Sequence, residues 1–483
     1  MTIITPNWVK DAVFYQIFPD RFARSPQGPR PGNLQPWGAP PTPHGFQGGN
    51  LAGVQEKLDY LVDLGVNAIY FNPIFMSASN HRYHTFDYYQ VDPLLGGNQA
   101  FKAMLAAAHQ RGIRVILDGV FNHASRGFFP FNHILETGAE SPYLDWFHIQ
   151  KWPLSAYDGE KPANYAGWWN QRELPKFNTD TPAVREYLWQ VATHWLAEGI
   201  DGWRLDVPNE IDDDQFWQTF RQRCKAVNPE AYIVGELWEE GDRWLQGDQF
   251  DAQMNYPFAR LALGFLAAQT LDQTDIQRTG IGEVPLLDGP AFARGLHTLH
   301  HQYHPEIVQA QMTMLSSHDT PRIFSVVQGD RTALRLLFLC QMTVAGAPNV
   351  YYGDEIGLPG RGDPDCRRAF PWDNTASWDL ALRADVRRYI TLRRALPALR
   401  RGDFSILLAT RHLVVYRRQY GSQVAVVALN PGRKEAHFHL PAAALALPLD
   451  HLPDLLSKDG HPLQPDVTMS VPARSGRVWG NQS

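Results

Sequence analysis

The stretch that decides the fold is GWRLDVPNE, residues 202–210. It follows a predicted helix that ends near Gly199, and its apolar start indicates a short buried strand. Arg204 and Asp206 stand two positions apart, so both side chains leave the strand on the same face. Buried opposite charges on one face indicate a paired site, because an unpaired buried charge is very costly. On this segment alone, a structural salt bridge and a functional site are equally good interpretations.

Three further apolar runs end in the same way, and each leads to a carboxylate. They are followed by Asp118, by Glu236 and by the pair His318-Asp319. In a closed parallel barrel the carboxyl ends of the strands converge on one face, where the active sites of such barrels lie. Four strand ends of this kind favour a functional site over four separate salt bridges.

Predicted strands alternate with amphipathic helices over most of the chain. The first two strands are predicted at 13–18 and 66–71. The helix between them has one apolar stripe, formed by Leu51, Val54, Leu58, Leu61 and Val62. Such alternation implies a parallel sheet, and eight strand–helix units fit the length to about residue 395. We therefore expect an α/β protein with a (β/α)8 TIM barrel.

Two long connections and a change of pattern divide the chain. Residues 25–50 contain seven Pro and six Gly. They suit either a disordered linker or an ordered loop at the barrel mouth, and we favour the loop. Residues 124–180 are a longer excursion, and connections of this length in a compact domain are usually functional. After residue 395, short β-rich runs predict an antiparallel β-sandwich. The predicted domains are a barrel at 1–123 and 181–395, an inserted subdomain at 124–180 and a C-terminal β-sandwich at 396–483.

Composition limits the class of protein. Of the 483 residues, 44% are hydrophobic and 19% are charged, which is typical of a globular protein of two or three domains. The net charge of −6 argues against a nucleic-acid partner. There is no run of 18 apolar residues and no signal-peptide pattern, so we expect no membrane association and a cytoplasmic location. Three Cys give no disulfide framework or metal-ligand spacing. The oligomeric state stays open.

The strand-end motifs resemble those of the alpha-amylase family of glycoside hydrolases. Residues 118–123 match the first signature of the family, and residues 202–206 match the second. Glu236 stands at the third signature and His318-Asp319 at the fourth. The resemblance runs firmly from about residue 8 to about residue 372, and it implies a barrel whose inserted subdomain forms one wall of a cleft.

Two further segments resemble one branch of that family. VPNE at 207–210 and LPKFN at 174–178 look like the neopullulanase, cyclomaltodextrinase and maltogenic amylase branch. Many members of this branch carry an N-terminal β-sandwich module. Because this sequence starts almost at the first barrel strand, we expect that module to be absent.

The resemblance implies roles for three carboxylates. Glycoside hydrolysis needs two carboxyl groups beside the scissile bond. Asp206 is the expected nucleophile, and the positive charge of Arg204 is expected to favour its ionised form. Glu236 is the expected general acid/base, with a pKa raised by its apolar strand and by Trp238. Asp319 is expected to hold hydroxyl groups of the cleaved sugar. The alternative interpretation is that these carboxylates cap helices.

Other residues are expected to bind sugar next to these carboxylates. His123 and His318 would donate to hydroxyl groups of the cleaved sugar, and Arg204 belongs to the same group. Tyr83 matches a family tyrosine that stacks on this sugar, although core packing is an alternative.

A second set of residues is expected farther along the cleft. Trp238 would stack on a sugar on the leaving-group side, which Asn209 and Glu210 extend, with a helix cap as the alternative for that pair. Asp363 and Arg367 resemble a pair that binds sugars on the non-reducing side, with a surface ion pair as the alternative.

Calcium is the point at which this chain departs from the resemblance. Neopullulanase-like relatives often carry an acidic loop after Asp-Arg-Phe and a Gly-Gly-Asp before the first helix. Here residues 23–28 contain no carboxylate, and Asn50 stands in place of the second Asp. Because Ca²⁺ prefers several oxygen ligands that include carboxylates, we expect no metal site and no cofactor. We expect Asn122, which could ligate another family calcium, to make a structural hydrogen bond.

The resemblance implies a retaining hydrolase of α-1,4-glucosidic bonds that forms a covalent glycosyl-enzyme on Asp206. The expected partners are α-glucan oligosaccharides, namely maltooligosaccharides and cyclomaltodextrins, with pullulan as a further candidate. One alternative is a transglycosylase of the maltogenic or branching type, which would use the same site. Another is a non-catalytic binding or transporter-associated subunit, and the three retained carboxylates argue against it.

Overall fold

The computed structural model describes residues 3–445, 451–457 and 460–481. Residues 1–2, which belong to the predicted barrel segment 1–123, lie outside the described residues. So do residues 446–450, 458–459 and 482–483, which belong to the predicted C-terminal domain 396–483.

Eight parallel strands close into a barrel, as the alternation of strands and helices predicts. They hydrogen-bond in the order β1-β10-β9-β8-β7-β6-β5-β2. The ring closes because Phe14 of β1 is paired with both Ala68 of β2 and Asn349 of β10. Their bounds are β1 (Phe14–Ile17), β2 (Ala68–Phe71), β5 (Arg114–Gly119), β6 (Gly202–Leu205), β7 (Tyr232–Gly235), β8 (Ala252–Asn255), β9 (Met312–Met314) and β10 (Ala347–Tyr351). Since all pairs are parallel, the eight carboxyl ends face one side.

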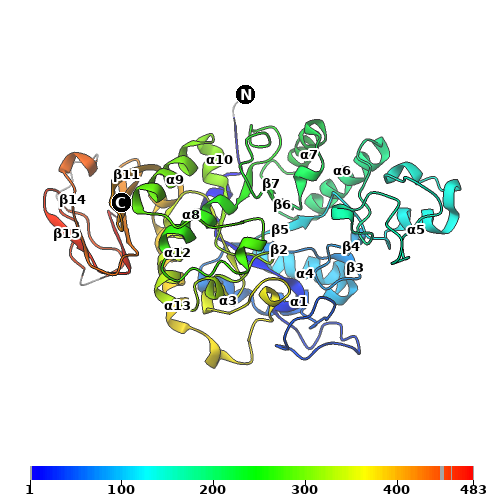
Figure 1. The fold of residues 1–483 in the computed structure, drawn as a ribbon, viewed down its shortest axis with the longest axis horizontal. Coiled ribbons are helices and arrows are strands. Elements are labelled where there is room, and N and C mark those ends of the chain that lie inside the picture. The colour runs from blue at the N-terminus through cyan, green and yellow to red at the C-terminus, as the bar shows by residue number, and fades with distance from the viewer. Residues whose placement is uncertain (1–2, 446–450, 458–459, 482–483) are drawn as a thin grey trace.

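Helices surround this barrel (Figure 1). The helices of the barrel domain are α1 (Pro19–Phe22), α2 (Leu51–Glu56), α3 (Leu58–Leu64), α4 (Gly97–Gln110), α6 (Pro182–Ala197), α7 (Asp214–Val227), α8 (Tyr256–Leu266), α9 (Gly289–His301), α10 (Pro305–Ala310), α11 (Ile323–Val326), α12 (Arg331–Thr343) and α13 (Leu380–Ala395). Within the described residues, no helix is both long and apolar enough to cross a bilayer.

The first predicted helical stripe needs one correction. The single helix expected from Leu51 to Val62 is split at Lys57 into α2 and α3. Within α3, Leu58 and Leu61 are buried whereas Val62 is 45% exposed. Val62 is therefore not a core residue.

The long loop at 25–50 is tied to the barrel by side-chain hydrogen bonds. Asp20 accepts the backbone N–H groups of Gln47 and Gly48 at 2.9 and 3.0 Å. The Asn80 amide donates to the carbonyls of Pro43 and Gly45 at 3.0 and 2.9 Å. Asn80 stands next to the hairpin of β3 (Phe75–Ser77) and β4 (Thr85–Val91), which follows β2. The loop therefore lies at the carboxyl end of β2, as an ordered loop at the barrel mouth would.

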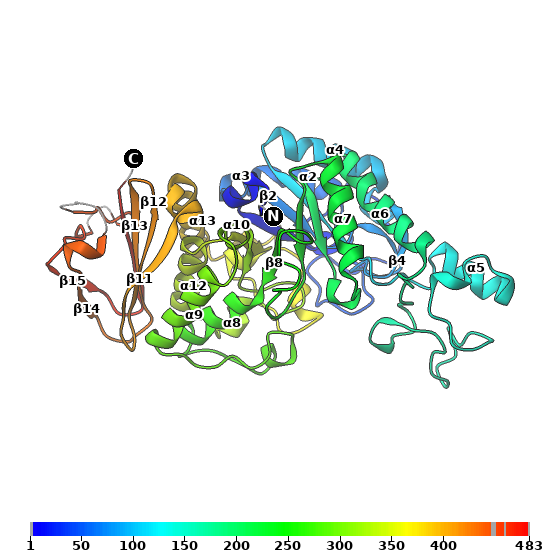
Figure 2. The ribbon, with the colours of Figure 1, turned by 90° about the horizontal axis from the view of Figure 1, so that it is seen from above.

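The excursion after β5 contains α5 (Phe129–Thr137) and irregular chain held by isolated bridges. Bridges pair His123 with Lys176 and Gly167 with Pro175, so the end of the excursion returns to its start. In Figures 1 and 2 this segment lies at one end of the molecule, and the C-terminal sheets lie at the opposite end.

The C-terminal domain is antiparallel, as predicted. Its four-stranded sheet has the order β11-β12-β13-β16, and β14 pairs with β15. The elements after the barrel are α14 (Pro397–Arg401), β11 (Asp403–Ala409), β12 (Val414–Tyr420), β13 (Gln423–Asn430), β14 (Ala436–His439), β15 (Thr468–Val471) and β16 (Ser475–Gly480). A second hydrophobic core, which includes Val426, Phe438 and Trp479, fills the space between the two sheets.

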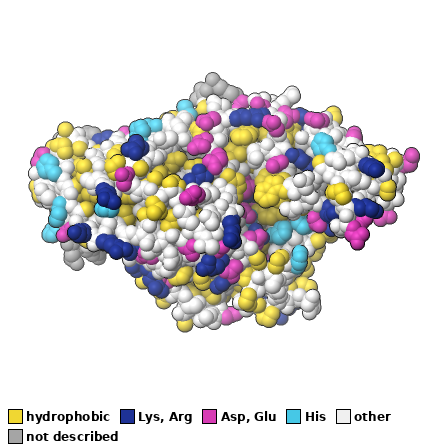
Figure 3. All heavy atoms as spheres, viewed as in Figure 1, with side chains coloured by type: hydrophobic (Ala, Val, Ile, Leu, Met, Phe, Trp, Pro, Cys, Tyr) yellow, Lys and Arg dark blue, Asp and Glu magenta, His cyan; other side chains and the backbone are white. Residues whose placement is uncertain are grey.

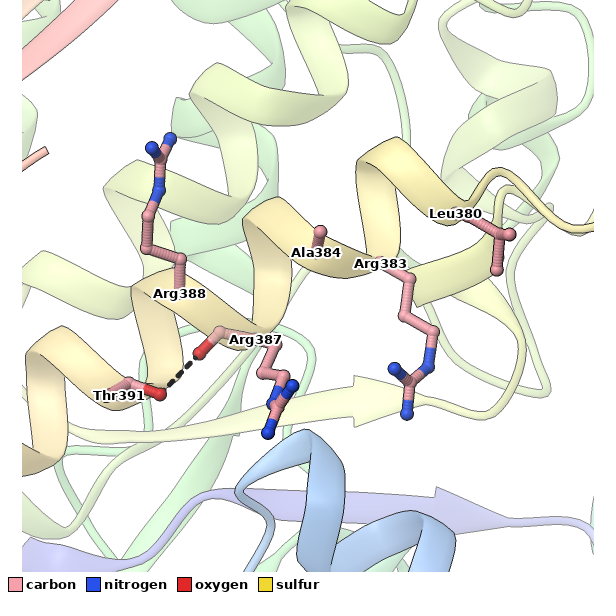
Figure 4. Close-up of a pocket in the computed structure, with 6 residues that line it drawn as sticks. All are labelled: Leu380, Arg383, Ala384, Arg387, Arg388 and Thr391. Carbon is pink, nitrogen blue, oxygen red and sulfur yellow. Dashed lines mark hydrogen bonds between the residues drawn. The ribbon is translucent and has the colours of Figure 1, made fainter. Parts of the chain in front are cut away.

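Helix α13 presents arginines on the outside of the barrel (Figure 4). Arg383 and Arg387 both pair with Asp63 of α3, at 2.8 and 2.9 Å. These two arginines, with Leu380, Ala384, Arg388 and Thr391, line a hollow of about 390 Å³. None of the six is a predicted site residue, so this hollow is separate from the site described next.

Candidate active site

Arg204 lies at the centre of three carboxylates. Its buried guanidinium contacts Asp118 at 2.8 Å and Asp206 at 3.0 Å through Nη1, and Glu236 at 3.0 Å through Nη2. The register of the barrel explains this grouping, because Asp118 of β5 is paired with Arg204 of β6 and Glu236 directly follows β7. One cation thus balances carboxylates from three neighbouring strands.

The turn after Asp206 connects two of these carboxylates. The backbone N–H of Val207 donates to Glu236 Oε2 at 3.0 Å. Val207 has a φ of 35°, in the left-handed region that a β-branched residue rarely adopts. Backbone strain of this kind clusters at functional sites. Among the described helices none uses Asp206, Glu236 or Asp319 as its N-cap, so the helix-cap interpretation is wrong for all three.

Burial dominates the electrostatics of the two central carboxyl groups. Desolvation raises the pKa of Glu236 to about 7, although Arg204 acts in the opposite direction. Desolvation also raises the pKa of Asp206 well above its usual range, and the negative charges of Glu236 and Asp118 add to this effect. Arg204 lowers the pKa of Asp206, as expected from the sequence, but burial outweighs its effect.

Asp319 lies in a different environment from these two carboxyl groups. Burial disfavours its charged form, but His318 and Arg367 outweigh burial and hold the pKa of Asp319 below its usual range. Asp319 Oδ2 lies 2.9 Å from His318 Nε2, and Asp319 Oδ1 lies 3.4 Å from Arg367 Nη2. Asp319 therefore offers an ionised acceptor for hydroxyl groups.

Tyr83 connects Asp118 with His318. Its ring is parallel to that of His318, and its hydroxyl lies 2.6 Å from His318 Nε2. The same hydroxyl donates to Asp118 Oδ2 at 2.9 Å. Tyr83 is only half-buried, so core packing does not account for its position.

His123 follows β5 and forms a bridge with Lys176 of the inserted segment. It is fully buried, and burial lowers the pKa of its ring to about 3, so the ring is neutral. Its Nδ1 lies 3.3 Å from the amide nitrogen of Asn122, which is the kind of structural contact expected for Asn122. Its Nε2 has no hydrogen-bond partner among the described residues.

Trp238, Asn209 and Glu210 are predicted from the sequence to bind sugar on the leaving-group side. Two of them, Trp238 and Glu210, contact other side chains of the described residues. Trp238 is half-buried and stacks on Tyr256, with ring centroids 3.7 Å apart. Glu210 pairs with Lys176 at 3.1 Å, which links the second motif to LPKFN. Asn209 is exposed on the same short helix, Pro208–Glu210. Both residues lie within this helix and do not cap it.

Asp363 and Arg367 form an ion pair of 3.0 Å. Asp363 is half-exposed, whereas Arg367 is nearly buried and also donates through Nε to the His318 carbonyl at 3.0 Å. Arg367 therefore connects this pair to Asp319, which a simple surface ion pair would not do.

Sequence reasoning missed several residues that contact the predicted ones. Gln16 of β1 lies 2.9 Å from His318 Nδ1, and Asn72, directly after β2, donates to the Tyr83 hydroxyl at 3.2 Å. Tyr70 donates to Asp118 at 2.8 Å. All three are polar side chains in or directly after a predicted barrel strand. A search of the sequence for polar residues at those positions would have identified them.

The residues at the position where relatives carry the acidic calcium loop do not fit Ca²⁺. The Asn50 side chain caps α2 by accepting from Gly53 N–H at 2.8 Å, and its Nδ2 faces the carbonyls of Ser25 and Gly48 at 3.4 Å. An amide N–H group thus occupies the space between carbonyls that a cation would need. In the described part of the chain no three His, Cys, Asp or Glu side chains are grouped as metal ligands.

The barrel, its strand-end carboxylates and the inserted segment define a glycoside hydrolase of the alpha-amylase family, and the chain belongs to this family. The family model described as "Alpha amylase, catalytic domain" matches residues 16–390. A cyclomaltodextrinase of Geobacillus thermopakistaniensis is 44% identical over 444 residues, which cover 91% of this chain and 72% of that protein.

Two solved structures are similar along their whole length. A protein of Thermus thermophilus is 48% identical with a TM-score of 0.93, over 99% of this chain and 100% of that chain. The debranching enzyme of Nostoc punctiforme is 47% identical with a TM-score of 0.91, over 100% of both chains.

Proposed function

We propose that the chain is a retaining hydrolase of α-1,4-glucosidic bonds in maltooligosaccharides and cyclomaltodextrins, with pullulan as a further candidate substrate. The observation that carries the proposal is the grouping of Asp206 and Glu236 around Arg204 at the carboxyl ends of neighbouring strands. The printed names of the relatives, a cyclomaltodextrinase and a debranching enzyme, support α-glucans as the substrate class.

In the proposed first step Asp206 attacks the anomeric carbon and forms a glycosyl ester. Glu236 gives its proton to the glycosidic oxygen as the bond to the leaving sugar breaks. The raised pKa of Glu236 supports the acid role, because the group is protonated below about pH 7. Asp206 must be ionised to attack, and the N–H···O contact of Arg204 with Asp206 stabilises that state once the proton has left.

In the second step Glu236, now ionised, takes a proton from water as the water attacks the ester and releases Asp206. Asp319 would accept hydroxyl groups of the cleaved sugar, and His318, His123 and Tyr83 would fix its orientation. No step uses a metal or cofactor, and the amide contacts of Asn50 support a calcium-independent enzyme. A cytoplasmic location is part of the proposal, supported by a 36% identical relative named intracellular maltogenic amylase from Bacillus subtilis.

Chromatography of the products from maltohexaose, β-cyclodextrin and pullulan tests the proposal. We expect shorter maltooligosaccharides from at least the first two substrates. Products longer than the substrate at high acceptor concentration would instead identify a transglycosylase. No product from any of the three would contradict the proposed substrate class.

A further inference from the structure

A row of three stacked rings leads from buried His123, which follows β5, to the surface. The His123 ring stacks on Trp168 with centroids 5.4 Å apart and an interplanar angle of 19°. Trp168 stacks on Trp169 at 4.5 Å and 13°. His123 is 1% exposed, whereas Trp169 is 73% exposed. The row therefore runs from the buried end of the site into solvent.

The outer ring of this row is held in place by a strained backbone. Trp169 and Asn170 have φ values of 48° and 59°, in the left-handed region. The segment is anchored, because Trp168 N–H donates to the Leu174 carbonyl at 2.9 Å and Gly167 is paired with Pro175. An exposed indole gains little from burial, so core packing does not explain why this strain persists.

The inner part of the row carries polar atoms that lack partners. Trp168 Nε1 and His123 Nε2 are both buried, and neither has a hydrogen-bond partner among the described residues. Buried polar groups are nearly always satisfied by protein, water or a ligand, so these two atoms on neighbouring rings are open to an added partner. Sugar hydroxyl groups can serve both atoms, since an indole N–H is a donor and a neutral imidazole nitrogen is a donor or an acceptor.

We infer that Trp169, supported by Trp168, is a stacking platform for a glucosyl residue beyond the one that is cleaved. This inference rests on the proposed function, and it makes Trp169 a residue that determines how longer α-glucans bind. The C–H face of a pyranose ring packs on the exposed indole, while its hydroxyl groups stay in water. Figure 3 shows one hollowed face of the molecule, on which hydrophobic side chains lie beside histidines.

Binding in an inactive background tests the platform directly. In an Asp206→Asn protein, maltohexaose is titrated while tryptophan fluorescence is followed. Adding Trp169→Ala should weaken the Kd for maltohexaose about five-fold, and Trp169→Phe should restore most of this loss. Phe129→Ala is the matched control, because Phe129 is 63% exposed on α5 of the same segment but lies outside the row. It should leave the Kd of the parent unchanged.

Kinetics in the active enzyme separate binding from chemistry. Trp169→Ala should raise KM for maltohexaose about five-fold while kcat changes less than about two-fold, and the effect should be smaller with maltotriose. Equal Kd values for Trp169→Ala and its parent, or equal losses in Trp169→Ala and Phe129→Ala, would overturn the platform. Failure of the wild-type protein to hydrolyse any α-glucan would count against the proposed function instead, and the binding experiment would still decide the platform.

Discussion

Glu236 accepts a hydrogen bond of 3.0 Å from the backbone N–H of Val207, the residue that follows Asp206. This contact joins the ends of β6 and β7, which pair in parallel through Leu205 and Gly235. The relative position of the two carboxyl groups is thus set by backbone hydrogen bonding as well as by their shared contact with Arg204. A rigid spacing is what a two-carboxylate mechanism requires.

The first prediction concerns stereochemistry. Retaining glycosidases hold their two carboxyl groups about 5–5.5 Å apart, with no room for a water molecule between nucleophile and sugar. With Asp206 and Glu236 on one guanidinium, we expect retention, so the first product from an α-linked substrate should be the α-anomer. Proton NMR within the first minutes of maltohexaose hydrolysis measures this. An early β-anomer would show inversion and remove Asp206 from the nucleophile role.

The second prediction is that Asp206→Asn abolishes turnover without damaging the fold. The amide has nearly the same shape but cannot form the glycosyl ester, so kcat should fall by at least about a thousand-fold. Because burial raises the pKa of Asp206, its charge opposes folding at neutral pH. We therefore expect an unchanged or higher Tm at pH 7. A variant that keeps a tenth of wild-type activity would contradict the assignment.

The strands predicted from the sequence are those in which apolar side chains occupy buried positions. The apolar runs at 13–18, 66–71 and 232–235 overlap β1, β2 and β7. Strands β8 and β10 carry no such pattern, because they contain buried Gln253 and Pro348. Their ladder partners lie on neighbouring barrel strands, Gly235 of β7 for Gln253 and Thr313 of β9 for Pro348, and local propensity cannot anticipate such pairing.

The same limit applies to the candidate site. Asp206, Glu236 and Asp319 could be predicted because each follows an apolar run. Gln16 could not, because its contact with His318 joins residues 302 positions apart. The direction of the Asp206 pKa was also out of reach, since desolvation depends on everything that surrounds the carboxyl group.

The third prediction is that activity and Tm survive dialysis against EDTA. The Asn50 Nδ2 group faces the carbonyls of Ser25 and Gly48, so no cation is needed to hold them. Asn50→Asp is the informative variant, because it would place a carboxylate against two carbonyls. Without Ca²⁺ this should cost about 1–3 kcal/mol of stability and lower the Tm. A wild-type loss of activity and Tm that Ca²⁺ reverses would contradict this interpretation of the loop.

The last prediction is that Glu236 sets the alkaline limb of the pH profile. Burial raises its pKa to about 7, and a general acid must be protonated, so kcat/KM should fall as the pH rises through about 7. Asp206 must be ionised, so activity should also fall in acid. Burial raises the pKa of Asp206 as well. The acidic limb of the profile should therefore lie at a pH above the ordinary Asp pKa of about 3.9. We expect a bell with a mildly acidic maximum.

Glu236→Gln tests this assignment with α-maltosyl fluoride, whose leaving group needs little protonation. The variant should hydrolyse the fluoride without an alkaline limb, since its amide does not titrate. Glu239→Gln is the matched control, because this exposed carboxylate three positions away pairs only with Arg260 among the described residues. It should keep the wild-type profile. If the alkaline limb persists in Glu236→Gln, another group controls it, and Glu236 is not the general acid.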